Sequence, residues 1–143
     1  MNLLMNKRLI TFGLAIMAVV QSYAQSIGEQ FQYSGDGGMN LIYQITKWSN
    51  SSNGDNQVCV IGTDKTPVEA TIPTEVIDRY NNHYKVTSIF RFSYAVNTQK
   101  LTIPEGITSI GEGAFGRLDK LETLSLPVSL SEIGKGAFGY CKN

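Results

Sequence analysis

The sequence predicts a mainly β fold in which short strands and turns stack as a solenoid, preceded by a β-hairpin. Residues 101–120 return 23 positions later as residues 124–143, with eight of the twenty positions identical. The identical positions are apolar residues, proline and glycine, whereas the charged positions change. A fixed period in the low twenties that keeps core and turn residues is typical of a stacked array. The hairpin follows from two runs of β-forming residues within residues 41–61.

The first 24 residues are predicted to be a secretory signal peptide. Lys7 and Arg8 precede an apolar run over residues 9–20, and Ser22 and Ala24 supply the small residues of a cleavage site. Twelve residues span about 18 Å as a helix, too short for a hydrocarbon core of about 30 Å. The run therefore fits a signal peptide rather than a membrane anchor. We expect the mature chain to be exported to the periplasm, the cell surface or the extracellular space, without membrane insertion.

The mature chain is expected to be one small domain of near-neutral charge. Residues 25–143 carry ten basic and twelve acidic side chains, with the two signs interspersed. A nucleic-acid-binding protein would show a basic patch, so this function class is excluded. The sequence also contains no basic amphipathic helix, which is the feature that would indicate binding to a membrane surface.

The two cysteines are expected to remain unpaired with each other. Cys59 falls near the start of the predicted stack and Cys141 at its end. A disulfide tolerates a Cα separation of only about 7 Å, which is shorter than the distance along such a stack. The sequence therefore predicts two buried thiols, with an intermolecular bridge through Cys141 as the alternative.

Residues 25–64 are predicted to form an N-terminal β-hairpin leader. Residues 41–45 are rich in β-formers, residues 49–56 form a polar loop that contains an Asn-Gly pair, and residues 58–61 return as a strand. An Asn-Gly pair between two such runs is a hairpin signal. Because a stacked array exposes strand edges at its ends, we expect this hairpin to cap the array.

Residues 65–143 are predicted to form the array, with one degenerate and two clear repeats. In the degenerate copy, residues 70–73 (Ala-Thr-Ile-Pro) and 86–89 (Val-Thr-Ser-Ile) match the clear copies. Between them lies an insertion over residues 77–85, and Ser93-Tyr94 aligns with the Ala-Phe pair of the clear copies. Atypical terminal repeats are expected of such arrays.

Each clear repeat is expected to begin with a short strand that proline ends. The strands at residues 101–103 and 124–126 should pair in parallel, with a third near residues 70–72. Alternation then turns Leu101 and Ile103 inward. Proline stops the pairing and turns the chain.

The second half of each repeat is expected to hold a tight bend and a stacked ring. Gly111 and Gly113 permit the positive φ of such a bend. Phe115 should lie over Phe138 in an aromatic ladder, in which each ring buries roughly 150–250 Å².

The consensus Leu-Thr-Ile-Pro-x-x-Ile-Thr-Ser-Ile-Gly-x-Gly-Ala-Phe-x-x-Leu-x-x-Leu resembles the BspA-type, or treponemal, leucine-rich repeat of exported bacterial surface proteins. The resemblance covers residues 70–143, and residues 31–61 are similar to the β-hairpin leader that often precedes such arrays. It implies a leucine-rich-repeat solenoid with a strand-lined concave side, and roles in surface exposure, adhesion and protein–protein interaction. The sequence stops at Asn143, just before the next strand is due, so a truncated fragment of a longer adhesin is an alternative.

The residue inventory predicts no catalytic, cofactor or metal site. His83 is the only histidine, and no cluster with zinc-ligand spacing accompanies it. Nucleophilic catalysis needs a base beside the nucleophile, and Gly-x-Ser-x-Gly is absent. The glycines at 111, 113 and 116 lack the Lys-Ser/Thr of a phosphate loop and recur in the next repeat. We therefore expect a protein that is not an enzyme.

Two groups of residues are candidates for contact with a partner. Trp48, Tyr80 and Tyr84 could form an exposed aromatic surface, because aromatic residues dominate interface energetics. The alternative is that these rings pack against the leader or the first repeat. A second group forms the C-terminal edge of the stack, which is expected to be apolar and partly uncovered: Leu130, Ile133, Phe138 and Cys141.

The leading functional hypothesis is a non-catalytic module for protein–protein interaction or adhesion. Its partner would be a host or cell-surface protein, and self-association through the C-terminal edge is a further expectation. The alternative is a carbohydrate-binding surface protein that stacks glycans on Trp48, Tyr80 and Tyr84.

Overall fold

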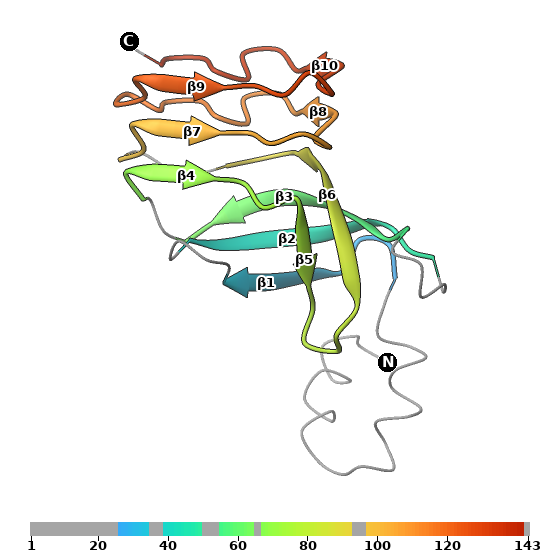
Figure 1. Ribbon diagram of the computed structural model, residues 1–143. Coiled ribbons are helices and arrows are strands. Elements are labelled where there is room, and N and C mark those ends of the chain that lie inside the picture. Colours follow the sequence, from blue (N-terminus) through green and yellow to red (C-terminus); the bar gives the residue numbers. More distant parts are fainter. Residues whose placement is uncertain (1–25, 35–38, 50–54, 65–66, 93–96, 142–143) are drawn as a thin grey trace, which may run out of the picture.

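The computed structural model describes residues 26–34, 39–49, 55–64, 67–92 and 97–141. These residues form two β-sheets and no helix (Figure 1). The predicted signal peptide, residues 1–24, lies outside them. The strands are β1 (Gln30–Ser34), β2 (Asn40–Lys47), β3 (Gln57–Thr63), β4 (Glu69–Thr71), β5 (Glu75–Ile77), β6 (His83–Ile89), β7 (Lys100–Thr102), β8 (Ser109–Ile110), β9 (Thr123–Ser125) and β10 (Glu132–Ile133).

The first sheet joins the N-terminal segment to the repeats. Its order is β1-β2-β3-β6-β8-β10, with β5 paired to β6. β2 and β3 pair antiparallel, which confirms the predicted hairpin, and β1 adds a third antiparallel strand. β3 then pairs in parallel with β6, so Val60 lies beside Ile89. The sheet thus runs without a break from the leader into the array.

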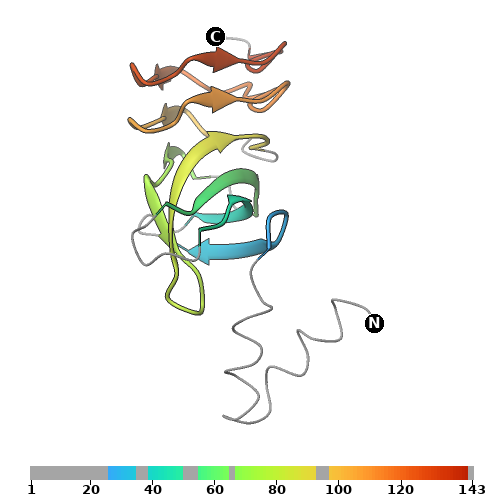
Figure 2. The same ribbon diagram turned by 90° about the vertical axis from the view of Figure 1, so that its right-hand side faces the viewer.

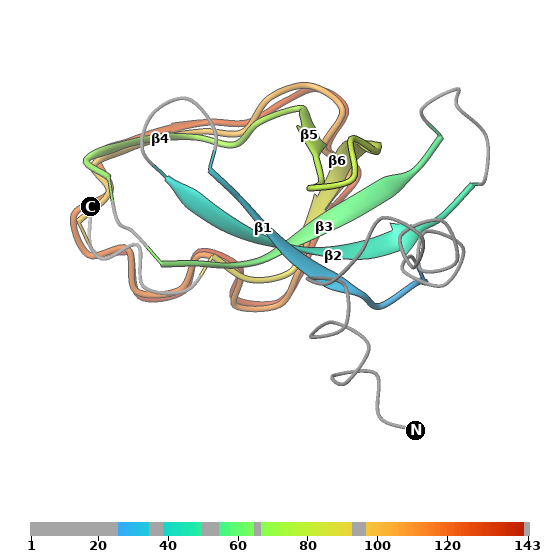
Figure 3. The same ribbon diagram turned by 90° about the horizontal axis from the view of Figure 1, so that it is seen from below.

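The second sheet contains the opening strand of each repeat. β4, β7 and β9 pair in parallel, with Ala70, Leu101 and Leu124 in register. This confirms the predicted pairing, although each strand begins one residue earlier than expected. In Figures 1 and 2 the three strands lie above one another at equal steps, and β8 and β10 follow the same steps on the opposite side. Figure 3 looks along this direction, and the successive repeats follow nearly the same path.

The core fills the space between the two sheets. Its largest fully buried side chains in the repeats include Ile72, Leu101, Ile103, Ile107 and Ile110. Their neighbours along the chain are more exposed, as expected where successive side chains of an extended segment point to opposite faces. Burial of these apolar side chains is the main stabilising contribution.

The predicted ring ladder is confirmed and is one ring longer than expected. Phe115 stacks on Phe138 with ring centroids 5.2 Å apart and planes 8° apart, and Phe92 lies 5.3 Å away on the other side. Ser93 and Tyr94, which the sequence aligned with this position, lie outside the described residues. Phe92 occupies the position instead, because Phe92 N–H donates to Ala114 O just as Phe115 N–H donates to Ala137 O. The degenerate repeat is two residues shorter between Ile89 and Phe92 than the next repeat is between Ile110 and Phe115, whereas Phe92 keeps the 23-residue spacing to Phe115.

The glycines of the bend divide into two kinds. Gly113 and Gly136 have φ of 62°, as predicted for Gly113. The prediction for Gly111 is wrong, because its φ is not among the positive values. Gly111 and Gly134 instead allow two backbones to approach: a Cβ on Gly134 would lie 2.6 Å from Gly111 C, and a Cβ on Gly111 would lie 2.9 Å from Phe90 O. A side chain there would force adjacent repeats apart.

Candidate functional site

The aromatic candidates lie in one region, but not as one exposed surface. Tyr84 is only 1% exposed, and its ring lies 6.0 Å from that of Trp48 and 5.2 Å from that of Phe31. The prediction of an exposed contact is therefore wrong for Tyr84, and the packed alternative holds for it. Trp48 is half-buried against the core, and Tyr80 is half-buried beneath the Arg79 guanidinium, 5.1 Å from its ring centroid.

The insertion at residues 77–85 explains why Tyr84 turns inward. Its turn is organised by the buried Asp78 carboxylate, which accepts hydrogen bonds from Tyr80 N–H (2.8 Å), Asn82 N–H (2.9 Å) and the Tyr84 hydroxyl (3.0 Å). Asn81 adopts a φ of 65° within the turn, a region that asparagine tolerates. An aspartate that binds backbone N–H groups ahead of it is a usual turn device.

Burial also alters the acidity of two tyrosines. Desolvation strongly raises the pKa of Tyr84, and the neighbouring Asp78 carboxylate raises it further. Desolvation raises the pKa of Tyr43 in the same way, with a smaller contribution from Tyr33. Both phenols therefore stay protonated in the folded protein at a pH where a free tyrosine ionises, about 10.

We expect the stability of the protein to fall as the pH rises above about 10. Below that pH, Tyr43 and Tyr84 are neutral in both the folded and the unfolded chain, and the stability is at its full value. Above it, these tyrosines ionise in the unfolded chain but stay neutral in the folded chain, so the unfolded state is favoured. Urea unfolding measured from about pH 8 to about pH 11 tests this. Tyr43→Phe should reduce the slope, and it removes no hydrogen bond because the Tyr43 hydroxyl has no partner among the described residues. Tyr140→Phe, at a site 81% exposed, should leave the slope unchanged; an equal effect of both variants would contradict the explanation.

The last described repeat presents an apolar face. We call the side of residues 123–141 that points away from the preceding repeat the end face. Leu124 is 37% exposed where its counterpart Leu101 is fully buried, and Ile133 is 52% exposed where Ile110 is 1% exposed. Each earlier residue is covered by the repeat that follows it, whereas no described residue covers the end face. Of the predicted edge residues, Ile133 is exposed, and Leu130, Phe138 and Cys141 are half-buried against the core.

The sequence analysis missed three further exposed apolar or aromatic residues of the last described repeat. Leu126, Val128 and Tyr140 are also exposed, Val128 to 95%. A signal existed, because Val128 stands where the preceding repeat has Glu105, and Tyr140 stands where it has Arg117. Two charged positions thus become apolar or aromatic in the last described repeat.

Glu105 fixes the turn that carries Val128. Its carboxylate accepts hydrogen bonds from Val128 N–H (2.9 Å) and Ser129 N–H (3.1 Å). The bond from Val128 N–H, together with those from Ser129, lowers the pKa of the Glu105 carboxyl from its ordinary value. Val128 is therefore presented by an ordered turn.

The two cysteines are both free thiols. Cys59 is buried in β3, and burial raises the pKa of its thiol. Cys141 is half-buried, with Sγ 3.5 Å from Phe115 O, so the prediction that both thiols are buried is wrong for Cys141. Among the described residues, no three His, Cys, Asp or Glu side chains gather as a metal site. No helix in that part of the chain is long and apolar enough to cross a membrane.

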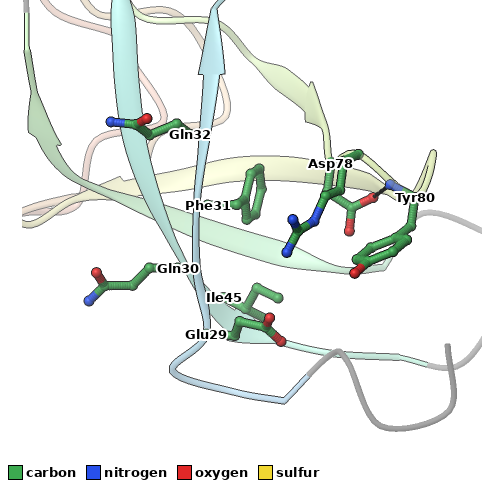
Figure 4. A pocket seen from close by; sticks show the side chains of 8 residues that line it. Glu29, Gln30, Phe31, Gln32, Ile45, Asp78 and Tyr80 are labelled. Carbon is green, nitrogen blue, oxygen red and sulfur yellow. Dashed lines mark hydrogen bonds between the residues drawn. The ribbon is translucent and has the colours of Figure 1, made fainter. Parts of the chain in front are cut away.

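A pocket of about 240 Å³ lies beside β1, facing the turn at residues 78–80. In Figure 4, Phe31, Ile45 and Tyr80 lie on one side of β1, whereas Gln30 and Gln32 point to the other side. The Tyr80 hydroxyl is buried and has no hydrogen-bond partner among the described residues. The residues that line the pocket are Glu29, Gln30, Phe31, Gln32, Ile45, Asp78, Arg79 and Tyr80.

Comparisons with solved structures find leucine-rich repeat proteins. A protein from Bacteroides capillosus ATCC 29799 is similar over 76% of this chain, with 24% identity and a TM-score of 0.59. Proteins from Bacteroides ovatus ATCC 8483 and Faecalibacterium prausnitzii A2-165, the second described as a leucine rich cell surface protein, have 28% and 22% identity and TM-scores of 0.56. They match over 69% and 79% of this chain.

The relatives differ in how much of their length this chain spans. It covers 72% of the Bacteroides capillosus chain, but only 26% of the Bacteroides ovatus chain and 29% of the Faecalibacterium prausnitzii chain. No curated protein matches the sequence. A family model described as "BspA type Leucine rich repeat region (6 copies)" matches residues 81–143. The resemblance to BspA-type leucine-rich repeat proteins is thus confirmed for residues 81–143, which form a repeat region of that type.

Proposed function

We propose that this protein is an exported, non-catalytic leucine-rich repeat protein that acts as a module for protein–protein interaction or adhesion. In this proposal residues 1–24 direct export, residues 25–64 cap the array, and residues 65–143 form a solenoid whose end face contacts a protein partner. A fold similar to that of a leucine rich cell surface protein supports a place at the surface.

The exposed apolar residues of the end face carry the proposal. Soluble proteins rarely expose a contiguous apolar patch unless it marks an interaction site. Here Leu124, Leu126, Val128, Ile133 and Tyr140 are all exposed within the same repeat. β9 and β10 also present strand edges that no described strand covers, and such edges readily pair with another chain.

The arrangement of β1, β2 and β3 supports the proposal that residues 25–64 cap the array. β3 pairs with the first rung of the repeats through β6, and β2 and β1 then continue the sheet away from the array. In Figure 3 these strands run diagonally across the outline of the repeats. Phe31 and Tyr33 of β1 pack against the core from this side. This placement supports the proposal that residues 25–64 cap the N-terminal end of the array.

A second copy of this chain is the partner that we test first. The end faces of two copies are both apolar, and a two-fold axis would pair like surfaces, as in most homodimers. In an antiparallel pairing of two β10 edges centred between Ile133 and Gly134, Glu132 of one copy falls opposite Lys135 of the other. Opposite charges across a strand pair are stabilising.

The test is the mass of the mature chain in solution. Multi-angle light scattering across a concentration series should detect a dimer. Val128→Lys and Ile133→Lys should each weaken the dimer by about tenfold or more, since each places a charge in an apolar contact. Ile27→Lys is the matched control, because Ile27 is exposed on the N-terminal segment. A monomer at every concentration, or an equal effect of the control, would contradict self-association through the end face.

A further inference from the structure

β1 is the edge strand of the first sheet, and one side of its backbone pairs with no strand that the structure describes. Among the described strands it pairs with β2 alone. Ile45 N–H donates to Glu29 O (2.8 Å), which identifies one hydrogen-bonded position of the ladder. Bonded and non-bonded pairs alternate in an antiparallel ladder, so Phe31 with Tyr43 is the next bonded pair.

The backbone groups of Gln30 and Gln32 therefore point away from β2. Both residues occupy the non-bonded pairs, opposite Gln44 and Ile42. A hydrogen bond on the other side of β2 is consistent with this register. Asp64, which directly follows β3, donates its N–H to Asn40 O, so the backbone groups of Asn40, and of Ile42 and Gln44 in alternation with it, face β3 and not β1. Two N–H donors and two C=O acceptors thus face the open edge. Gln30 and Gln32 are two residues apart, a spacing of about 6.6 Å along a strand.

A pocket adjoins β1, between this strand and the turn at residues 78–80. Gln30 and Gln32 line it although their side chains point away from Phe31 in Figure 4, as expected if they contribute backbone. The side chains of Phe31, Ile45 and Tyr80 provide an apolar surface. The volume of about 240 Å³ is below the 300–1,000 Å³ typical of small-molecule sites, and it suits a single large side chain.

β1 lacks the features that usually protect an edge strand. Such strands commonly carry a lysine, another charge, a proline or a bulge. The sequence of β1, Gln-Phe-Gln-Tyr-Ser, contains no charged residue and no proline, and its register with β2 has no bulge. β2, by contrast, has register shifts against β3.

We infer that β1 accepts an extended peptide segment of a partner protein as an additional strand. The peptide backbone bonds to the outward N–H and C=O groups of Gln30 and Gln32, and one large apolar side chain enters the pocket against Phe31, Ile45 and Tyr80. Main-chain bonds supply affinity and the pocket supplies specificity, as in other cases of strand addition. This site lies on the leader, whereas the end face lies on the last described repeat, so either site can fail alone.

The protein side of the test compares two substitutions at one position. Gln32→Pro removes the outward N–H, and the bonds between β1 and β2 remain because Gln32 donates none of them. Proline is tolerated on edge strands with that orientation. Gln32→Ala keeps the N–H and removes only the side chain. We expect Gln32→Pro to weaken peptide binding by about tenfold or more and Gln32→Ala to leave it unchanged.

The probe is the blocked peptide Thr-Val-Thr-X-Thr-Val-Thr, with X as Leu, Phe, Gly or Lys, titrated by fluorescence anisotropy. Leu and Phe should bind more tightly than Gly and Lys. N-methylation of the amides that alternate toward β1 should abolish binding, whereas N-methylation of the other set should not. Circular dichroism and thermal unfolding verify that each protein variant is folded; should Gln32→Pro unfold, the N-methylated peptides give the same discrimination.

Three results would overturn the inference. The first is the absence of saturable binding by any of the four peptides. The second is an equal loss of peptide affinity with Gln32→Ala and Gln32→Pro, because a side-chain contact would then explain the binding. An equal loss of affinity with both sets of N-methylated peptides would have the same meaning, because the backbone bonds of strand addition involve only one set. The third is saturable binding of monosaccharides such as glucose, galactose or N-acetylglucosamine in place of the peptides, which would assign the pocket to a glycan.

Discussion

Replacement of Phe115 by alanine is expected to lower the free energy of unfolding by about 3–5 kcal/mol. The Phe115 ring is fully buried between Phe92 and Phe138, and it contacts both at centroid distances close to 5 Å: 5.3 Å and 5.2 Å. The truncation removes buried apolar surface and leaves a cavity in the middle of the ladder. Few residues could relax into it, because backbone hydrogen bonds hold the bends that carry the three rings in register: Phe92 N–H donates to Ala114 O and Phe115 N–H donates to Ala137 O.

Urea unfolding monitored by circular dichroism measures this loss. Tyr140→Ala is the control, because Tyr140 is an exposed aromatic residue of the last described repeat, and its truncation should cost less than about 0.5 kcal/mol. A loss below about 1 kcal/mol for Phe115→Ala would mean that the ring does not hold adjacent repeats together.

Gly134→Ala is expected to separate the last described repeat from the one before it. The new Cβ would lie 2.6 Å from Gly111 C, and the atoms that it meets are backbone, which cannot rotate away as a side chain can. Gly134 N–H also donates to Ile110 O at 2.7 Å, so the two repeats cannot move apart without losing this bond. We expect a loss of about 3 kcal/mol, the upper end of the range for overpacking.

Amide hydrogen exchange at residues 133–141 measures this separation directly. A loss of about 3 kcal/mol would speed exchange there by roughly a hundredfold. Gly136→Ala is the matched control: its Cβ would meet nothing within 4 Å, and only the positive φ of 62° opposes it. This strain costs about 1–2 kcal/mol. A larger effect of Gly136→Ala than of Gly134→Ala would show that backbone conformation, not close approach, explains the glycine at 134.

The repeats could be predicted because equivalent residues of successive repeats lie next to each other in the stack. A shift of 23 residues brings Leu101 beside Leu124 and Phe115 beside Phe138, so identical residues at that spacing are also contacts in space. The strands and the ring ladder follow from this. The same period extends to Phe92, which lies 23 residues before Phe115, but an alignment based on the Val-Thr-Ser-Ile match placed Tyr94 there, because the degenerate repeat lacks two residues between Ile89 and its ring.

The candidate sites depended on contacts between segments that the 23-residue repeat does not relate to each other. The aromatic residues of the insertion could have faced solvent or the leader, and the hydrogen bond from Tyr84 to Asp78 decides that Tyr84 faces inward. The position of Gly111 was predictable, but its role was not, because a close approach to Phe90 is a relation between two backbones.

The sequence by itself determined the repeat, its strands, the stacked rings and the resemblance to BspA-type leucine-rich repeats. Only the tertiary structure decided that β3 pairs with β6, that the last described repeat exposes Val128 and Tyr140, and that the amides of Gln30 and Gln32 lie at the open edge of β1, beside a pocket. The reason is physical. A repeated residue meets its own counterpart one period away, whereas the pairing of the leader, the uncovered faces and the direction of an edge amide depend on contacts between segments that share no period.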